Sequence, residues 1–478
     1  MHLRTSLVGA TFMCIAATSA IWQGCQSSHS THMPSNFKYP TSRVEPVIDT
    51  LWETEVADPY RWLEDDRASE TSEWVDAQNA LTRSHLDSIP LRAELRSRFE
   101  ALFNYEKIGV PRKMGGRYFI SKNDGLQNQS VWYVRETLNG TDALFLDPNL
   151  LSNDGTVTAS LGSASEDERW LTVIQSSAGS DWQEIHLYDL NTGESTGEIL
   201  NWVKFSGTSW SGNGFYYSRY PEPDGSEYSA ENTYHSVYYH QIGTDQSADR
   251  LIFRNDEEPN RYHFAYATED QKFLVLSTST GTDGNSIHVR SLEIENAPWV
   301  EVIGGFDTRS SLIDHTNGQF LVLTDQDAPK YRLIGIDSQK ADRWTEIIPE
   351  SEHLLESVNS TGGQLFATYL RNACNAVVRY NVDGTNAREI KLPGLAGSIG
   401  GFGGKAEATE TFYAFTSFTQ PTSIYRYDMT SEESQLFAAP SVDFDPEDYT
   451  AYQAWYPSAD GTSIPMFIVH KKDLVKDG

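Results

Sequence analysis

At 478 residues, the chain is long enough for two domains, or for one large repeat domain with additions. Hydrophobic residues make up 38% of it and aromatic residues 12%, which suits a folded protein richer in strands than in helices. Its 67 acidic and 37 basic residues give a formal net charge of −30, which repels phosphate backbones and anionic lipid surfaces and argues against nucleic acid as a partner.

The N-terminus has the pattern of an export signal. His2 and Arg4 precede an apolar run at residues 7–21, which is shorter and richer in small residues than a membrane-spanning helix. Residues 18–20, Thr-Ser-Ala, offer a small-residue cleavage site. We therefore expect residues 1–25 to be a leader and the protein to be exported to a bacterial periplasm.

Cys25 offers a second way in which the leader could be processed. It follows Gly24 and precedes polar residues, as the lipidated cysteine of a bacterial lipoprotein does. Trp22 and Gln23 depart from the small or aliphatic residues that are usual there. A membrane tether through lipidated Cys25 and free secretion therefore both stay open, and residues 26–36 are interpreted as a flexible tether.

Residues 37–110 are predicted to be helical. The first helix has Ser69–Ser72 as capping residues in front of a face that repeats every three or four residues. Pro90 is expected to open a second helix as its first residue. Residues 58–63 contain turn-forming and bulky aromatic residues that do not suit a regular helix, and they are expected to form an ordered surface strap. The two helical faces are Trp74, Gln78, Leu81 and His85, and then Leu95, Phe99, Leu102 and Phe103.

From residue 111 to residue 447 the pattern changes to short strands that recur with one period. A polar turn followed by an apolar strand returns at intervals of about 45–58 residues, and a second strand follows each time. The first strands lie near Tyr118, Trp170, Phe215, Phe273, Phe320, Leu365 and Phe412, and the second near Val131, Ile185, Val237, Ile287, Tyr331, Val377 and Ser423. Seven units with room for four strands each predict a seven-bladed β-propeller. A β-helix has much shorter repeats, and two sandwiches would not keep one period for so long.

The repeat ends before residues 448–478. Residues 453–456 and 465–470 flank the turn Ser458–Gly461, which predicts a hairpin. An isolated hairpin is marginal in water, so we expect these to be the first strands of a further domain that is truncated here.

Cysteine and histidine residues do not form a metal or disulfide pattern. Besides Cys14 and Cys25 there is only Cys374, which is interpreted as a single buried structural thiol. The histidines of the repeat are expected to be hydrogen-bonded or solvated rings, and no metal or cofactor is expected. These histidines are His235, His240, His263, His288 and His315.

Eight short segments occur in the order and at the spacing found in one peptidase family. They are Asp58–Asp65 (DPYRWLED), Trp74–Asn79 (WVxxQN), Gly125–Gln129 (GLQNQ), Leu146–Asn149 (LDPN), Gly179–Trp182 (GSDW), Val203–Ser206 (VKFS), Gly243–Ser247 (GTDQS, after Ile242 in place of leucine) and Ser458–Lys472. By these segments the chain resembles the prolyl oligopeptidases over residues 39–478. The resemblance implies a seven-bladed propeller that caps an α/β-hydrolase domain, to which residues 37–110 and the segment from residue 448 belong.

Hydrolysis of an amide by this family needs a serine, a histidine and a carboxylate, and the serine of an α/β-hydrolase lies on a G-x-S-x-G turn. The chain has one literal match, Gly193–Gly197, which follows a polar turn within the repeat and is not expected to carry a nucleophile. A near match, residues 396–400, has alanine at the first place and is interpreted as a glycine-rich propeller loop. By resemblance the catalytic triad lies beyond Gly478, so this chain alone is expected to be inactive.

The resemblance implies a serine endopeptidase, monomeric at full length, that cleaves short peptides after proline through an acyl-enzyme, with the propeller as a size filter. Phe205 is then a candidate apolar contact for the peptide, although a phenylalanine of a blade core stays open. Thr282 lies near the position at which the family has a cysteine that faces the substrate pocket, so this contact differs here. The alternative is a non-catalytic propeller that binds a partner, or the inactive product of a truncated gene. Cleavage after Arg or Lys is less favoured because the matched motifs are of the prolyl type.

Overall fold

The computed structural model describes residues 38–395 and 397–477. The leader expected at 1–25, with Cys25, and the tether expected at 26–36 lie outside the described residues. The chain divides into two compact units, residues 1–90 and 91–478, and each is described by itself. The domain boundary expected between residues 110 and 111 stays a prediction. Among the described residues, no helix has both the length and the apolar character needed to cross a membrane.

The first unit contains a hairpin and one long helix. Strands β1 (Ile48–Leu51) and β2 (Thr54–Ala57) pair antiparallel, a short 3₁₀ helix η1 follows at Arg61–Glu64, and α1 spans Ser69–Asp87. The predicted first helix is thus confirmed. Its expected cap is wrong, because the helix is preceded by Ala68 in an extended conformation and no side chain caps it.

The predicted surface strap contains η1 and is held by polar contacts within the first unit. The Arg61 guanidinium donates to the Asp58 carboxylate at 2.6 Å. The Trp62 indole N–H donates to the carbonyl of Arg43 at 2.9 Å, and the Arg43 guanidinium lies over the same indole ring. Side-chain contacts therefore order a segment whose residues do not favour a regular helix.

The second unit begins with α2, which spans Arg92–Phe103. The predicted helix is confirmed, although it starts two residues after Pro90. Its predicted apolar stripe, Leu95, Phe99, Leu102 and Phe103, is exposed.

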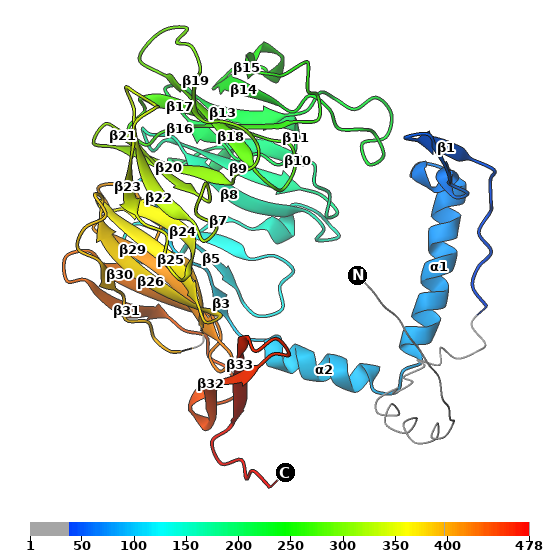
Figure 1. Cartoon of the computed structure of the whole chain (residues 1–478). Coiled ribbons are helices and arrows are strands. Elements are labelled where there is room, and N and C mark those ends of the chain that lie inside the picture. Colours follow the sequence, from blue (N-terminus) through cyan, green and yellow to red (C-terminus); the bar gives the residue numbers. More distant parts are fainter. Residues whose placement is uncertain (1–37, 396, 478) are drawn as a thin grey trace, which may run out of the picture. The chain divides into compact units, whose positions relative to one another are not determined.

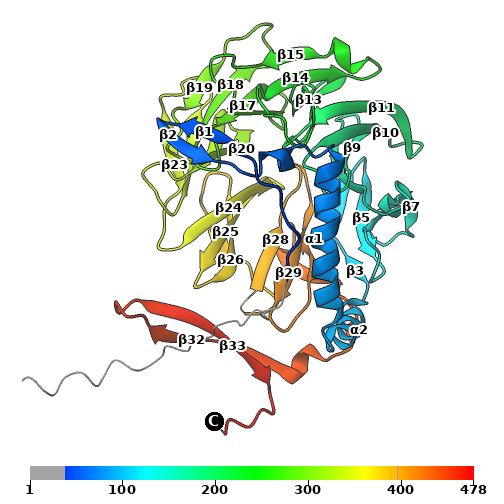
Figure 2. The same ribbon diagram turned by 90° about the vertical axis from the view of Figure 1, so that its right-hand side faces the viewer.

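Seven antiparallel units of four strand positions follow in chain order, and we number them blades 1 to 7. They stand around a common centre (Figures 1 and 2). Blade 1 contains β3 (Lys107–Ile108) and β4 (Arg112–Met114), β5 (Arg117–Asn123), β6 (Val131–Arg135) and β7 (Ala143–Leu146). Blade 2 contains β8 (Thr158–Ala164), β9 (Trp170–Ser176), β10 (Gln183–Asp189) and β11 (Glu194–Val203). Blade 3 contains β12 (Ser209–Trp210), β13 (Gly214–Arg219), β14 (Ser236–Gln241) and β15 (Arg250–Phe253).

Blades 4 to 7 repeat the same order. Blade 4 contains β16 (Tyr262–Ala267), β17 (Phe273–Ser279), β18 (Asn285–Ser291) and β19 (Val300–Ile303). Blade 5 contains β20 (Ser310–Thr316), β21 (Gln319–Thr324), β22 (Arg332–Asp337) and β23 (Trp344–Ile348). Blade 6 contains β24 (Leu354–Thr361), β25 (Gln364–Arg371), β26 (Cys374–Asn381) and β27 (Arg388–Glu389). Blade 7 contains β28 (Gly397–Gly401), β29 (Glu410–Ser417), β30 (Ser423–Asp428) and β31 (Glu433–Ala438).

The strands predicted from the sequence are the second and third of each blade. Two other expectations were wrong. Cys374, the first residue of β26, is half-buried rather than buried. Residues 397–400, taken for a loop, lie in β28 and pair with β29. Close packing explains why position 397 is a glycine, because a Cβ on Gly397 would clash with a ring carbon of Phe415.

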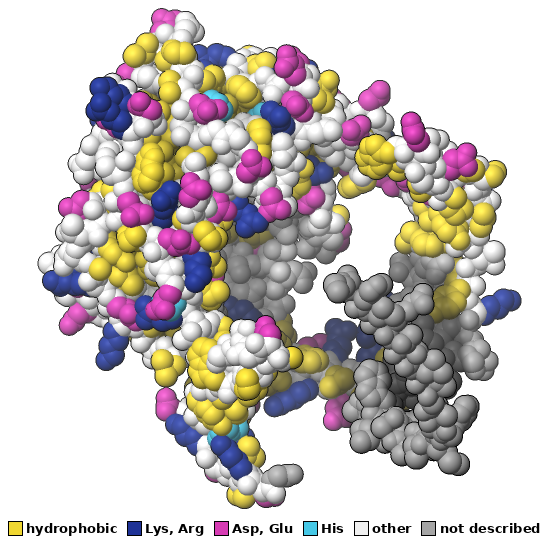
Figure 3. All heavy atoms as spheres, viewed as in Figure 1, with side chains coloured by type: hydrophobic (Ala, Val, Ile, Leu, Met, Phe, Trp, Pro, Cys, Tyr) yellow, Lys and Arg dark blue, Asp and Glu magenta, His cyan; other side chains and the backbone are white. Residues whose placement is uncertain are grey.

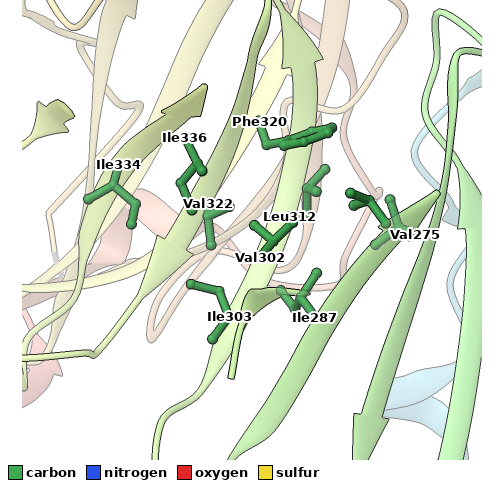
Figure 4. Packing of buried hydrophobic residues seen from close by; sticks show 10 residues of the cluster. Val275, Ile287, Val302, Ile303, Leu312, Phe320, Val322, Ile334 and Ile336 are labelled. Carbon is green, nitrogen blue, oxygen red and sulfur yellow. The ribbon is translucent and has the colours of Figure 1, made fainter. Parts of the chain in front are cut away.

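Buried apolar side chains form the seams between neighbouring blades. One cluster joins blades 4 and 5 through side chains such as Val275, Leu312 and Phe320 (Figure 4). Corresponding clusters join blades 1 and 2, 2 and 3, 5 and 6, and 6 and 7. Each blade thus covers the apolar face of its neighbour, which is why a single four-stranded blade needs the ring.

The seam between blades 3 and 4 is different in the part of the chain that the structure describes, since none of these apolar clusters spans it. The hydroxyl of Ser218 donates to the carbonyl of His263 at 2.7 Å, and the amide of Ala267 donates to the hydroxyl of Ser209 at 2.9 Å. The amide of His263 donates to Nδ1 of His235 at 3.0 Å. Hydrogen bonds and rings therefore replace the aliphatic contacts found at the other seams.

Side chains close the ring between blades 7 and 1. Tyr118 of β5 packs edge-on against Phe412 of β29, with Ile424 in the same cluster, and the Tyr118 hydroxyl donates to the Glu410 carboxylate. The two blades are separate sheets, so backbone ladder bonds do not add to this contact.

The C-terminal hairpin is confirmed. Strands β32 (Tyr449–Pro457) and β33 (Ser463–Lys471) pair antiparallel after a short 3₁₀ helix η4 at Pro446–Asp448. Side-chain contacts join the hairpin to the blades: the Gln453 side chain donates to the carbonyl of Asn372 at 2.6 Å, and the Phe467 ring lies 5.2 Å from that of Phe418. Figure 3 shows apolar side chains gathered over this hairpin, whereas acidic and basic side chains are interspersed over the blades.

We expect Phe412→Ala to lower the free energy of unfolding by roughly 3 kcal/mol, because it removes a buried ring from the closing seam and leaves a cavity. Urea-induced unfolding of the chain, followed by fluorescence, measures the difference. Leu251→Ala is the control, since Leu251 is half exposed on the outer strand of blade 3 and its loss should change stability by less than about 0.5 kcal/mol. Equal stability of the two variants would show that the seam contributes little.

Candidate functional site

The segment Trp202–Ser206, which leads from blade 2 to blade 3, has an unusual backbone. Trp202 and Phe205 have φ values of 61° and 54°, in the left-handed region that residues other than glycine rarely occupy. Each such residue costs on the order of 1 kcal/mol, and it persists only where surrounding contacts hold it. The Phe205 side chain is 49% exposed. Phe205 is therefore a surface residue and does not belong to a blade core.

Blade 3 holds this segment, which we call the Phe205 turn, through the pairing of Val203 with Arg219 and through hydrogen bonds at its two ends and its middle. The amide of Tyr220 donates to the carbonyl of Trp202 at 3.0 Å. The amide of Ser218 donates to the hydroxyl of Ser206 at 2.8 Å. Between these two contacts, Nε2 of His235 lies 3.1 Å from the carbonyl of Lys204. The two ends and the middle of the turn are thus each fixed.

His235 is buried and neutral. Its exposed fraction is 1%, and burial lowers the pKa of its imidazole to about 4. His263 is equally buried, and burial followed by the nearby charge of His235 lowers its pKa to about 4. Its Nδ1 lies 3.0 Å from the Thr278 hydroxyl. Both rings therefore act at neutral pH as uncharged hydrogen-bonding groups.

Aromatic rings surround the Phe205 turn. The ring of Phe205 lies 6.1 Å from that of Tyr262, and the ring of His235 lies 4.8 Å from that of Tyr220. Trp202 packs edge-on against Trp182 at 5.7 Å. Such rings offer flat apolar faces without charge, which suit apolar groups of a ligand.

One cation lies on this aromatic surface. The Lys204 ammonium is 4.8 Å from the Trp182 ring and 5.7 Å from the Phe205 ring. A cavity of about 380 Å³ adjoins it, lined by both tryptophans and by Glu227 and Tyr228 among others. The indole N–H of Trp182 donates to the Glu227 carbonyl at 2.8 Å, which ties the long β13–β14 connection to this cavity.

Thr282, which stands near the position of a pocket cysteine in the resembling family, lies in the exposed turn between β17 and β18 of blade 4. It is thus placed on the surface, and whether it contacts a ligand stays open. No group of three or more His, Cys, Asp or Glu side chains in residues 38–395 and 397–477 could hold a metal ion.

The opposite end of the ring holds a second cavity, which the sequence did not indicate. The inner strands begin near the Phe205 turn, as Tyr262 of β16 does, and they end around a cavity of about 510 Å³ lined by residues of blades 2 to 7. There the Glu269 carboxylate of blade 4 accepts the amide N–H of Ala406 of blade 7 at 2.9 Å. The hydroxyl of Ser360 also donates to the Asp314 carboxylate at 2.7 Å. The Glu269–Ala406 hydrogen bond links blades 4 and 7 across this end. The end at the Phe205 turn instead presents exposed aromatic rings, so it is the better candidate for contact with an apolar ligand.

A separate buried histidine stabilises the seam between blades 2 and 3. Nδ1 of His240 lies 2.7 Å from Asp249, and its Nε2 lies 3.1 Å from Glu198. Burial alone would lower the pKa of His240, but the two carboxylates outweigh it and the pKa is raised. This histidine thus serves structure, as the sequence suggested.

A family model described as prolyl oligopeptidase, N-terminal β-propeller domain, matches residues 39–440. The prolyl endopeptidase of Elizabethkingia meningoseptica is 42% identical over 447 residues, which are 92% of this chain and 63% of that protein. The prolyl endopeptidase of Elizabethkingia miricola is 41% identical over 454 residues, 94% of this chain and 64% of that protein. The chain therefore spans less than two thirds of the length of these relatives.

Solved structures agree with the sequence matches. A structure from a study of two prolyl endopeptidases is 32% identical, with a TM-score of 0.83, and the match covers 92% of this chain and 65% of that one. Prolyl oligopeptidase B of Galerina marginata, bound to a 35-residue hydrolysis and macrocyclization substrate, is 28% identical with a TM-score of 0.80. That match covers 91% of this chain and 65% of that one.

We expect acid to destabilise the seam between blades 3 and 4. The pKa of His235 and of His263 is about 4 in the folded chain and about 6.5 when unfolded, so between these values the unfolded state binds protons that the folded state does not. Stability should therefore fall as the pH drops from 7 to 5, by about 2 kcal/mol for each histidine. Urea unfolding at a series of pH values measures this.

The control for this pH dependence is His240, whose raised pKa gives a contribution of opposite sign. Its contribution is complete below about pH 6.5 and is lost as the pH rises through its higher folded pKa. His235→Gln should flatten the loss of stability toward pH 5, whereas His240→Gln should not flatten it and should make it steeper, because it removes a contribution of opposite sign. An unchanged slope in His235→Gln would contradict the assignment.

Proposed function

Since the chain belongs to the prolyl oligopeptidase family through that family's N-terminal propeller, we propose that it supplies the substrate-gating propeller of a serine endopeptidase that cleaves short peptides after proline. Two relatives that match more than nine tenths of the chain are named prolyl endopeptidases. The chemistry proposed is acyl-enzyme formation by a serine that a histidine activates and a carboxylate orients.

The observation that carries this proposal is the Phe205 turn. A half-exposed aromatic ring on a strained backbone, held by hydrogen bonds, is the kind of feature that a binding surface retains at a cost in stability. Phe205 is proposed to contact an apolar side chain of the bound peptide. The hydrogen bond between Glu269 of blade 4 and Ala406 of blade 7, which joins two distant blades at the other end of the ring, supports a filter that admits only short, flexible peptides.

The propeller and the catalytic residues are proposed to belong to different domains. The one G-x-S-x-G match in the sequence, Gly193–Gly197, lies at the turn from β10 into β11 and is followed by a strand instead of the helix that a nucleophile turn needs. The buried histidines serve hydrogen bonds within and between blades. We assign the serine, aspartate and histidine to an α/β-hydrolase domain of which β32 and β33 are the first strands. The exposed apolar side chains of this hairpin, such as Trp455 and Met466, support a partner surface for it.

We expect purified residues 38–478 not to hydrolyse peptides and not to react with a fluorophosphonate that labels activated serines. The full-length gene product should hydrolyse a fluorogenic Gly-Pro peptide and should prefer it to an Arg-Arg peptide. Cleavage by residues 38–478 would show a nucleophile within them. A full-length product without label or cleavage would instead favour a non-catalytic binding propeller.

Phe205→Ala should raise the KM of the full-length gene product for a prolyl peptide about tenfold and leave kcat within about twofold, because it removes an apolar contact made equally in the ground and transition states. Steady-state kinetics measure both constants. Trp344→Ala is the matched control, since Trp344 is an equally exposed aromatic on the outer strand of blade 5. If both variants have the KM of the unaltered protein, Phe205 does not contact the peptide.

Export and a lipid anchor at Cys25 are also proposed, on the pattern of residues 1–25. In a bacterial host, the chain should be found in the membrane fraction and Cys25→Ala in the soluble periplasmic fraction. If the unaltered chain and the Cys25→Ala variant were found in equal amounts in the soluble periplasmic fraction, the protein would be freely secreted and not anchored.

A further inference from the structure

The Phe205 turn needs support at its middle. Left-handed backbone at Trp202 and again at Phe205 is unfavourable for both residues, and a flexible connection would relax it. The contacts of Tyr220 and Ser206 fix the two ends. They do not orient the peptide group that joins Lys204 to Phe205, and the orientation of that group determines where the Phe205 ring points.

His235 makes the contact that orients this peptide group. The amide N–H of His263 donates to Nδ1 of His235, so Nδ1 carries the lone pair and the proton is on Nε2. That N–H donates to the Lys204 carbonyl at 3.1 Å. The tautomer is thus set by the backbone of blade 4, and the donor is aimed at the turn between blades 2 and 3.

Packing fixes the ring of His235 in this position. It lies 4.8 Å from the ring of Tyr220, 5.3 Å from that of Phe264 and 5.9 Å from that of Tyr262. Tyr262 is also the ring against which Phe205 rests. His235 therefore contacts both parts that position Phe205. It donates to the Lys204 carbonyl next to the Phe205 backbone, and it packs against Tyr262, which supports the Phe205 side chain.

An apolar residue would suit the seam better if its only role were packing. The other six seams are filled by aliphatic and aromatic clusters, and burying a neutral imidazole costs free energy unless both nitrogens are satisfied. Here both are satisfied, and one of the two partners is the turn that carries Phe205. This arrangement indicates a role beyond filling space.

We propose that His235 is a positioning residue, which fixes the ring of Phe205 for the bound peptide by donating a hydrogen bond from Nε2 to the carbonyl of Lys204. That Phe205 meets the peptide rests on the proposed function. That His235 sets the conformation of the turn does not, and it is tested separately.

Two conservative variants separate the two hydrogen bonds of His235. The amide nitrogen of glutamine reaches about as far as Nε2, so His235→Gln keeps a donor for the Lys204 carbonyl. The amide oxygen of asparagine lies where Nδ1 does, so His235→Asn keeps only the acceptor for the His263 amide. Both variants leave a polar side chain of similar size in the seam, and their melting temperatures check that they fold.

The kinetic test uses the full-length gene product and a prolyl peptide. His235→Asn should raise KM about tenfold with kcat within about twofold, as Phe205→Ala does, and His235→Gln should stay within about twofold of the unaltered protein. The double variant His235→Asn/Phe205→Ala should have the KM of either single variant, because both changes remove one contact. Equal losses in the Asn and Gln variants, or additive losses in the double variant, would overturn the proposal.

The structural test uses residues 38–478 and does not depend on catalysis. In the unaltered chain, ¹⁵N NMR of labelled histidine should show the Nε2–H tautomer of His235 at pH 7, and the Nδ1–H tautomer or a charged ring would overturn the proposal. Hydrogen exchange at the amides of Ser218 and Tyr220 should become at least about tenfold faster in His235→Asn and remain slow in His235→Gln. Slow exchange in both variants would show that the turn does not need His235.

The kinetic and structural tests together distinguish failure of the proposed peptide contact of Phe205 from failure of the proposed role of His235. If Phe205→Ala leaves KM unchanged while His235→Asn loosens the turn, the proposed peptide contact is wrong and the role of His235 in the turn stands. If Phe205→Ala raises KM while His235→Asn changes neither KM nor exchange, the contact stands and the role of His235 is overturned.

Discussion

The propeller depends on the burial of each blade against its neighbours. A four-stranded antiparallel sheet with apolar residues on both faces has nowhere else to place them, and the clusters between blades show where they go. Closure is made by the same kind of contact, because Tyr118, Phe412 and Ile424 join the last blade to the first without a shared strand. At its closing seam the ring is thus held by side-chain contacts, which are the packed rings and the hydrogen bond from Tyr118 to Glu410.

One seam departs from this rule, and it adjoins the candidate site. Between blades 3 and 4, His235, His263 and Ser218 form hydrogen bonds where the other seams have aliphatic clusters. Hydrogen bonds impose direction, whereas apolar contacts do not. A seam built in this way can hold the Phe205 turn in a conformation that packing alone would let relax.

Much of the fold could be predicted, and the strands that the sequence missed have one cause. The second and third strands of each blade are buried on both faces, so runs such as those at Phe320 and Val377 are apolar and recognisable. Inner and outer strands lack that pattern: β12 has two residues, β27 is Arg388–Glu389, and β28 contains three glycines. They are strands because a neighbouring strand pairs with them, which local sequence does not show.

The sequence by itself determined the period of the repeat, the helices before it, the hairpin after it and the family resemblance that singled out Phe205, since all of these depend on residues close together in the chain. Only the tertiary structure decided that Phe205 is exposed and strained, and that His235, thirty positions further on, supports it. That contact arises because His235 lies between the turn that leaves blade 2 and the first strand of blade 4. The order of residues along the chain does not show which side chains the fold brings together in this way.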